Sequence, residues 1–178
     1  MSILCPKCQQ RRDAENPTAP CPHCGQLAVE NSAATAASDL NHQGVLYANQ
    51  GRFEPAIAAF DEALRINPQL ASAYNNRGYS QVALKHLDLA IADFGAALGL
   101  NPKFAEAYNN RGLAYMAQQR FDLAFADFET AVQLDPRLTL AYLNRGFSSA
   151  GQGHFEAALA DLNLCLERNP SLVNARCR

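Results

Sequence analysis

The chain has 178 residues, a formal net charge of -2 and a charged-residue content of 18%. A charge so close to zero creates no long-range field that would attract the chain to nucleic acid or to anionic lipid. No apolar run approaches the length of about 20 residues that a membrane span requires. The chain begins without an apolar signal sequence, so we expect a cytoplasmic protein whose partners are other proteins.

Four cysteines stand in two CxxC pairs near the start of the chain. They are Cys5, Cys8, Cys21 and Cys24, with twelve residues between the pairs. Two CxxC pairs at this separation are a strong signal for a bound zinc ion. Four thiolates complete the closed tetrahedral shell of a structural site and leave no open position for a catalytic water. Residues 1–25 are too short and too polar to bury a core, so we expect this segment to fold only with its metal.

Other uses of this segment are weaker. Thioredoxin-type redox chemistry needs one CxxC beside a strand and a helix, and disulfides need an export signal. His23 is a further potential ligand, although four cysteines already fill the shell. The cysteine pattern resembles a zinc ribbon or a rubredoxin-like knuckle, and the resemblance implies the metal but not the partner. The basic residues among 7–12 leave nucleic-acid contact as a minor alternative, because Asp13 and Glu15 follow directly.

Residues 26–36 join the cysteine segment to the rest of the chain. Their alanine-rich sequence fits a linker or an N-terminal extension of the helix that follows. The sequence alone does not decide between these two interpretations.

From Ala37 onward the chain repeats itself every 34 residues. The four blocks span 37–70, 71–104, 105–138 and 139–172. With Ala37 as position 1, four positions recur: glycine at position 8 (Gly44, Gly78, Gly112, Gly146), alanine at position 20 (Ala56, Ala90, Ala124, Ala158), phenylalanine or leucine at position 24 (Phe60, Phe94, Phe128, Leu162) and proline at position 32 (Pro68, Pro102, Pro136, Pro170). A period of this length predicts stacked helical units.

Each block divides into two predicted helices. In the third block, apolar residues at helical spacing predict helices over about 106–118 and 122–134. The proline at position 32 ends each block, because it disfavours a helical conformation in the residue before it. A glycine inside a helix costs about 1 kcal/mol relative to alanine. Its retention in all four blocks predicts that Gly112 and its counterparts receive a bulky side chain from the facing helix.

Two charged positions change together from block to block. Position 7 is Arg77, Arg111 and Arg145, position 23 is Asp93, Asp127 and Asp161, and the first block has Gln43 and Ala59 instead. The paired change predicts an ion pair between facing helices, with the bidentate geometry that suits guanidinium and carboxylate. We interpret this pair as structural.

The repeated positions resemble the tetratricopeptide repeat over residues 37–172. The chain departs from that pattern at Leu40, where the family favours tryptophan, at Leu162, which replaces an aromatic residue, and at Cys165, which replaces alanine. The resemblance implies an all-α solenoid of four repeats, coiled as a right-handed superhelix. It also implies a protein-interaction module without enzymatic activity.

The resemblance further implies a concave face, lined through positions 2, 5, 6, 9, 12 and 13 of the first helices. The residues that we expect to bind peptide there are Asn76, Asn110 and Asn144 at position 6, Tyr79, Leu113 and Phe147 at position 9, and Met116 at position 12. Each asparagine amide offers one acceptor and two donors, which match the backbone of an extended peptide. The alternative is that asparagine is only tolerated at a solvated position.

Some members of the family hold acidic C-terminal tails with a carboxylate clamp of lysines and an arginine. The corresponding positions here are Asn41, Val45, Asn76, Glu106 and Asn110, of which only Asn76 matches the clamp. Clamp-type recognition is therefore not expected. The apolar residues of the face favour peptides that carry hydrophobic side chains.

Only residues 173–178 follow the fourth block, and we expect them to form an incomplete cap. The last second helix then exposes Leu159, Leu162 and Leu166. An apolar patch of this kind marks a contact surface. Either the native chain continues or a second subunit covers this end, and a homodimer is one expected outcome.

The sequence shows no catalytic constellation, and we predict that the protein is not an enzyme. The favoured function is a protein–protein interaction adaptor that binds extended peptide segments in its concave groove. The alternative is an assembly scaffold that self-associates through its last repeat. Nucleic-acid contact through the zinc segment is a third and weaker alternative.

Overall fold

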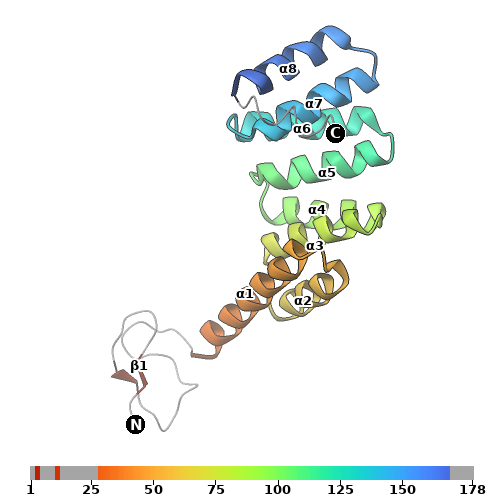
Figure 1. The fold of residues 1–178 in the computed structure, drawn as a ribbon. Helices are drawn as coiled ribbons and strands as arrows, with labels where there is room; N and C mark the ends of the chain where they lie inside the picture. Colours follow the sequence, from red (N-terminus) through yellow and green to blue (C-terminus); the bar gives the residue numbers. More distant parts are fainter. Residues whose placement is uncertain (1–2, 5–10, 13–27, 169–178) are drawn as a thin grey trace.

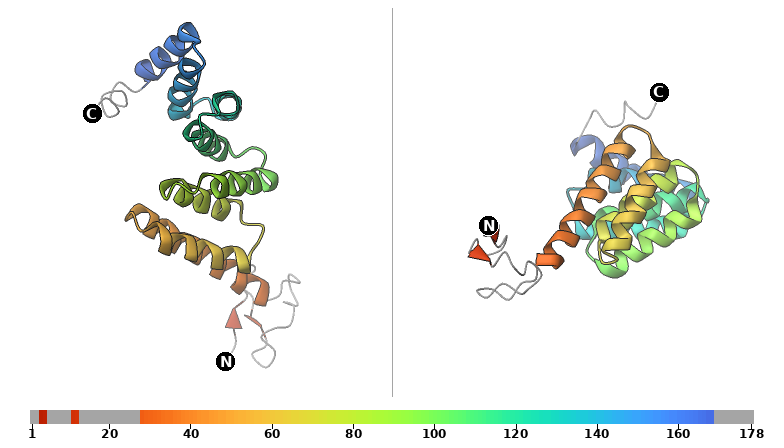
Figure 2. Two further views of the ribbon diagram at one scale, coloured as in Figure 1. Left: turned by 90° about the vertical axis from the view of Figure 1, so that its right-hand side faces the viewer. Right: turned by 90° about the horizontal axis from the view of Figure 1, so that it is seen from below.

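The computed structural model describes residues 3–4, 11–12 and 28–168 of the chain. Within these residues, eight α-helices follow one another as four pairs that stack into a curved array (Figures 1 and 2). The helices are α1 (Ala28–Asn49), α2 (Phe53–Ile66), α3 (Ala71–Ala83), α4 (Leu87–Leu100), α5 (Ala105–Ala117), α6 (Phe121–Leu134), α7 (Thr139–Gly151) and α8 (Phe155–Arg168). The predicted helical solenoid is confirmed.

The junctions between pairs follow from the proline at position 32. At the end of α4, Asn101 has an extended backbone (φ -133°, ψ 90°), because Pro102 disfavours the helical conformation there. The Asn101 side chain then accepts a hydrogen bond from the Lys103 backbone N–H (3.1 Å), which stabilises the turn. The predicted helices of the third block agree with α5 and α6 to within one residue at each end.

Within a pair, the two helices approach most closely where a glycine faces a phenylalanine. A Cβ atom built on Gly112 would lie 2.6 Å from the ring of Phe128, and one built on Gly78 would lie 2.8 Å from the ring of Phe94. Both rings are fully buried. The predicted use of the repeated glycine is therefore confirmed for these repeats, because a Cβ at either position would force the ring to shift.

Between pairs, each first helix runs across the preceding second helix in the opposite direction. Its N-terminal half covers the C-terminal half of the second helix, as when Ala141 packs with Ala131 and Val132. The C-terminal half of the first helix covers the N-terminal half of the preceding second helix. There the Ser148 hydroxyl donates a hydrogen bond to the Phe121 backbone carbonyl (2.8 Å), and the Phe121 ring lies against Gly151.

The start of the described chain differs from the repeats. Helix α1 begins at Ala28, so residues 28–36 extend the first repeat helix beyond the end of α2 (Figure 1). Strands β1 (Ile3–Leu4) and β2 (Arg11–Arg12) pair antiparallel, with Leu4 opposite Arg11. Among the residues that the structure describes, no helix is long and apolar enough to cross a membrane.

Candidate functional site on the inner face of the array

The first helices form the inner layer of the curve. Consecutive first helices contact each other, α1 with α3, α3 with α5 and α5 with α7. Within the described part of the chain, no second helix contacts another second helix. The first helices are therefore the more closely spaced layer, which places them on the concave side (Figure 2). We call this surface the inner face.

Six asparagines of the inner face form one continuous hydrogen-bonded series, which we call the asparagine ladder. Its three rungs between helices are the side-chain amide donations from Asn76 to Asn41 (3.1 Å), from Asn110 to Asn75 (3.0 Å) and from Asn144 to Asn109 (2.8 Å). Weaker bonds at 3.4 and 3.5 Å join Asn75 to Asn76 and Asn109 to Asn110 within their helices. The ladder therefore links all four first helices.

Some of the side-chain amide groups that we expected to bind a peptide are used in the hydrogen bonds of the ladder. An asparagine amide has two N–H donors, and one N–H of Asn76 and of Asn110 is taken by a rung. Both residues are half-buried and keep a second N–H, whereas Asn144 is only 3% exposed. Asn76 and Asn110 are thus better placed than Asn144 to meet a ligand, and peptide contact by all three stays a prediction.

Sequence reasoning missed the partners of these three asparagines. Asn75 and Asn109 at position 5, together with Asn41, accept the rungs. A signal was present in the sequence, because the Asn-Asn pair occurs at positions 5 and 6 of both the second and the third block. Only the structure shows that the two asparagines of a pair contact different neighbouring helices.

Large apolar side chains lie beside the ladder on α3 and α7. Tyr79 is 55% exposed and Phe147 is 40% exposed, and they lie two repeats apart. Leu113 and Met116 are half-buried between them, and Leu140 is exposed near Phe147. The predicted apolar residues therefore all lie on the first helices, and they differ in how far their side chains are exposed.

The inner face carries little charge. At the six repeat positions assigned to it, the only formally charged residue is Glu106, which is exposed. The repeated arginines do not serve this face, because they are held by the second helices. Arg111 donates two hydrogen bonds to Asp127, from Nε and Nη2, both at 2.8 Å. These bonds raise the pKa of the Arg111 guanidinium above its ordinary value, which keeps it charged in the pair.

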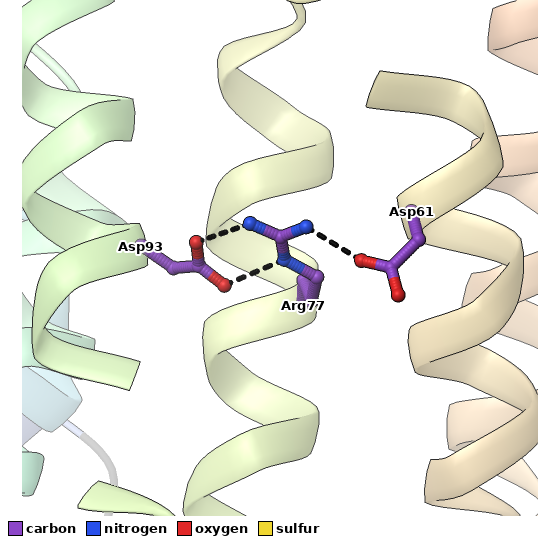
Figure 3. A network of polar contacts seen from close by, with 3 residues as sticks. All are labelled: Asp61, Arg77 and Asp93. Atoms are coloured by element: carbon purple, nitrogen blue, oxygen red, sulfur yellow. Dashed lines mark hydrogen bonds and ion pairs between the residues drawn. The ribbon is translucent and has the colours of Figure 1, made fainter. Parts of the chain in front are cut away.

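The predicted arginine–aspartate pair is confirmed in the last three repeats. Arg77 goes further than its counterparts, because its guanidinium lies between Asp93 of α4 and Asp61 of α2 (Figure 3). It thereby ties α3 to its own partner helix and to the preceding repeat. This contact is structural and occupies the Arg77 guanidinium, which is therefore not free to meet an acidic ligand.

The outer side of α8 carries an apolar surface, which we call the α8 face and define as Phe155, Leu159 and Leu166. Their exposed fractions are 72%, 60% and 39%. Leu166 occupies position 28, where Leu64, Leu98 and Val132 of the earlier repeats are 7%, 7% and 8% exposed. Leu162, which the sequence also assigned to this contact surface, is half-buried. In the earlier repeats, the residue at position 28 packs against the first helix of the next repeat.

The four cysteines of the predicted zinc site lie outside the described residues. The described part of the chain contains no cluster of three or more His, Cys, Asp or Glu side chains that would hold a metal ion. The zinc site therefore stays a prediction.

The architecture defines the class of protein, a helical-repeat solenoid. Models of the tetratricopeptide repeat match residues 105–138 and 140–172, and a TPR repeat model matches 44–85 and 82–119. The chain belongs to the tetratricopeptide-repeat family. No curated protein is detectably similar to it.

Several solved structures share the fold. The crystal structure of MamA superposes with a TM-score of 0.70 at 23% identity, over 82% of this chain and 85% of that one. The thermophilic TPR protein TTC0263 of Thermus thermophilus gives 0.69 at 24% identity, over 76% and 75% of the two chains. The first TPR of Spaghetti (RPAP3), bound to the HSP90 peptide SRMEEVD, gives 0.66 at 27% identity, over 67% of this chain and 95% of that one.

Proposed function

We propose that the protein is a non-enzymatic adaptor that binds an extended peptide segment of a partner protein along its inner face. The observation that carries the proposal is the asparagine ladder with exposed Tyr79 and Phe147 beside it. The remaining amide N–H groups offer donors to a peptide backbone, and the aromatic rings offer apolar contacts. A related repeat domain, the first TPR of RPAP3, is described in complex with a peptide, which supports this use of the fold.

The chemistry of the face selects the kind of peptide. Glu106 opposes an acidic ligand, and the repeated arginines Arg77, Arg111 and Arg145 are paired with aspartates of the second helices rather than available to clamp a carboxylate. Neighbouring helices pack about 10 Å apart and an extended chain advances about 3.3 Å per residue, so Tyr79 and Phe147 lie roughly six peptide residues apart. We therefore propose an internal segment with two apolar side chains at about this separation. Each backbone hydrogen bond adds only about 1 kcal/mol, so a micromolar Kd is expected.

The test uses nine-residue peptides that are blocked at both ends and carry Leu or Phe at the second and eighth positions. Fluorescence anisotropy should show micromolar binding of such peptides and much weaker binding of SRMEEVD. Phe147→Asp should weaken binding at least tenfold. The matched control is Leu123→Asp on α6, because Leu123 is also 40% exposed but lies on a second helix. Equal losses for the two variants, or preference for SRMEEVD, would contradict the proposal.

A second candidate function is self-association through the α8 face. The exposure of its apolar side chains favours this function. Where a first helix packs on the second helix of the preceding repeat, its residues at positions 3 and 10 are small and fully buried, as with Ala141 and Ser148. Helix α1 has Asp39 and Leu46 at these positions, so stacking of α1 on α8 in the repeat register would bury a charge and a bulky side chain. A second copy is therefore expected to meet α8 with its own α8, which gives a closed two-fold dimer.

Light scattering under reducing conditions tests this candidate. The unmodified chain should form a dimer at micromolar concentration, and Leu159→Glu should give monomers, since each buried leucine contributes roughly 1.5–3 kcal/mol. Leu162→Glu combined with Leu166→Glu should act in the same way. Reductant is needed because an interchain disulfide at Cys177 would imitate association. A monomeric unmodified chain would exclude self-association through this surface.

We also propose that Cys5, Cys8, Cys21 and Cys24 hold one structural zinc ion. The chemistry of four thiolates supports zinc rather than a hard cation that prefers oxygen. When bound, the ion would organise the N-terminal segment by crosslinking its two CxxC pairs.

A further inference from the structure

Glu106 lies on the inner face without a charged partner in the described part of the chain. Its side chain is exposed, and none of the ion pairs among the described residues includes it. It stands in the first turn of α5, where the helix dipole favours an acidic side chain. The equivalent residues of α3 and α7 are Ser72 and Leu140, and neither helix has an acidic residue in its first turn. The repeat fold therefore does not require an acid at this position.

Glu106 and the large apolar residues lie on opposite sides of the asparagine ladder. Residues 106, 109, 110 and 113 have the spacing that places side chains in one stripe along a helix. Glu106 precedes the two asparagines of α5 by about one turn, or about 5 Å along the axis, and Leu113 follows them by about the same distance. Tyr79 and Phe147 share the repeat position of Leu113. A peptide that follows the ladder therefore has the aromatic residues on one side and Glu106 on the other.

The side chains of an extended peptide alternate between these two sides. The proposed peptide places its second and eighth residues opposite Tyr79 and Phe147. Helix α5 contacts both α3 and α7 and lies between them, so the fifth residue passes over α5 (Figure 1). This residue is three positions from each apolar residue, and successive side chains of an extended chain point in opposite directions. Its side chain therefore points away from the aromatic side and toward Glu106, whichever way the peptide runs.

We infer that Glu106 selects a peptide that carries Lys or Arg at its fifth residue, midway between the two apolar residues. The inference rests on the proposed function and adds the charge of the partner segment to it. Charge complementarity supports it, because Glu106 is the only formally charged residue at the six inner-face positions. The long side chain of Lys or Arg spans the single helical turn between the ladder and the carboxylate. Arg can also donate two parallel hydrogen bonds to that carboxylate.

Three blocked nine-residue peptides test the inference. Each carries Leu at the second and eighth residues, and they differ only in Lys, Gln or Glu at the fifth. Fluorescence anisotropy at low salt should show the Lys peptide binding about threefold more tightly than the Gln peptide, and the Glu peptide more weakly than either. The preference should shrink in 0.5 M salt, because exposed charges are screened.

Variants of the chain assign the preference to one side chain. Glu106→Gln should give the Lys and Gln peptides the same Kd, and Glu106→Lys should reverse the order of the three peptides. The matched control is Glu54→Gln, because Glu54 is also exposed in the first turn of its helix but belongs to the second helix α2. This control should keep the full preference for the Lys peptide.

The possible failures are distinguishable. Equal Kd values for the three peptides with the unmodified chain would overturn this inference and leave the proposed function standing. A preference for the Lys peptide that persists in Glu106→Gln would assign the selection to another residue and would also overturn it. Absence of binding by all three peptides would contradict the proposed function itself, and this inference with it.

Discussion

The third and fourth repeats share a pattern of residues but differ in what their second helices meet. Phe121 and Phe155 occupy the same repeat position, yet Phe121 lies beneath Gly151 of the next repeat while Phe155 is 72% exposed. The comparison shows that burial in a solenoid is decided by the neighbouring repeat as much as by the side chain. The arginine–aspartate pair within one helix pair, by contrast, should be alike in the two repeats.

The largest expected difference in stability between equivalent substitutions in the two repeats is at Phe121 and Phe155. Phe121→Ala should destabilise the array by about 2 kcal/mol, since removal of a fully buried phenylalanine costs about 3–5 kcal/mol and Phe121 is only half-buried. Phe155→Ala should cost less than about 0.5 kcal/mol, as for other surface substitutions. Urea unfolding followed by circular dichroism measures both. Similar losses would show that α8 is covered in solution.

Breaking the arginine–aspartate pair should cost the same stability in the third and fourth repeats. Asp127 is 8% exposed in its pair with Arg111, and Asp161 is 11% exposed in its pair with Arg145. Each pair joins the two helices of a single repeat, so Asp127→Asn and Asp161→Asn should each cost about 1–3 kcal/mol. The same unfolding assay applies. Values that differ by more than about 1 kcal/mol would mean that the neighbouring repeat also supports the pair.

Substitution of the repeated glycine by alanine should change stability by amounts that differ less between the two repeats. A Cβ at Gly112 meets the buried Phe128 ring at 2.6 Å, whereas one at Gly146 meets nothing closer than the Ala158 carbonyl oxygen at 3.2 Å. Crowding costs about 1–3 kcal/mol and the gain in helix propensity returns about 1 kcal/mol. Gly112→Ala should therefore destabilise by about 1 kcal/mol, and Gly146→Ala should be close to neutral. The reverse order would contradict the packing described here.

Metal removal should have the smallest effect on the repeats. Protein purified without added zinc should contain about one equivalent by elemental analysis, and Cys21→Ser should release it. The helical signal of the array should change little, because the repeats bury their own core. Stoichiometric iron, or four free thiols without metal, would argue against the zinc assignment.

Contacts inside a repeat were predictable from the sequence. The four blocks act as an internal alignment, so the joint change at positions 7 and 23 identified the ion pair. The retained glycine predicted that a bulky side chain of the facing helix approaches Gly112, and the structure shows that this side chain is Phe128. Both contacts depend on the fixed geometry of one helix pair. The paired helices of the third block were also placed to within one residue.

Contacts between repeats were not predictable to the same degree. A rung of the asparagine ladder joins residues 35 apart in the chain, and it requires a spacing between helices that the repeat period does not specify. The sequence therefore suggested three asparagines facing a ligand, whereas Asn144 is buried in a rung. The extension of α1 back to Ala28 was also undecided, because alanine-rich sequence suits a helix and a linker alike.

The central claim, that the inner face binds an extended peptide, is tested most directly by nuclear magnetic resonance. A ¹⁵N-labelled sample titrated with a blocked nine-residue apolar peptide should show shifts in the side-chain amides of Asn76 and Asn110. Backbone amides around Tyr79, Leu113 and Phe147 should shift with the same micromolar Kd. Shifts confined to the second helices α2, α4 and α6 or to the α8 face would contradict the account.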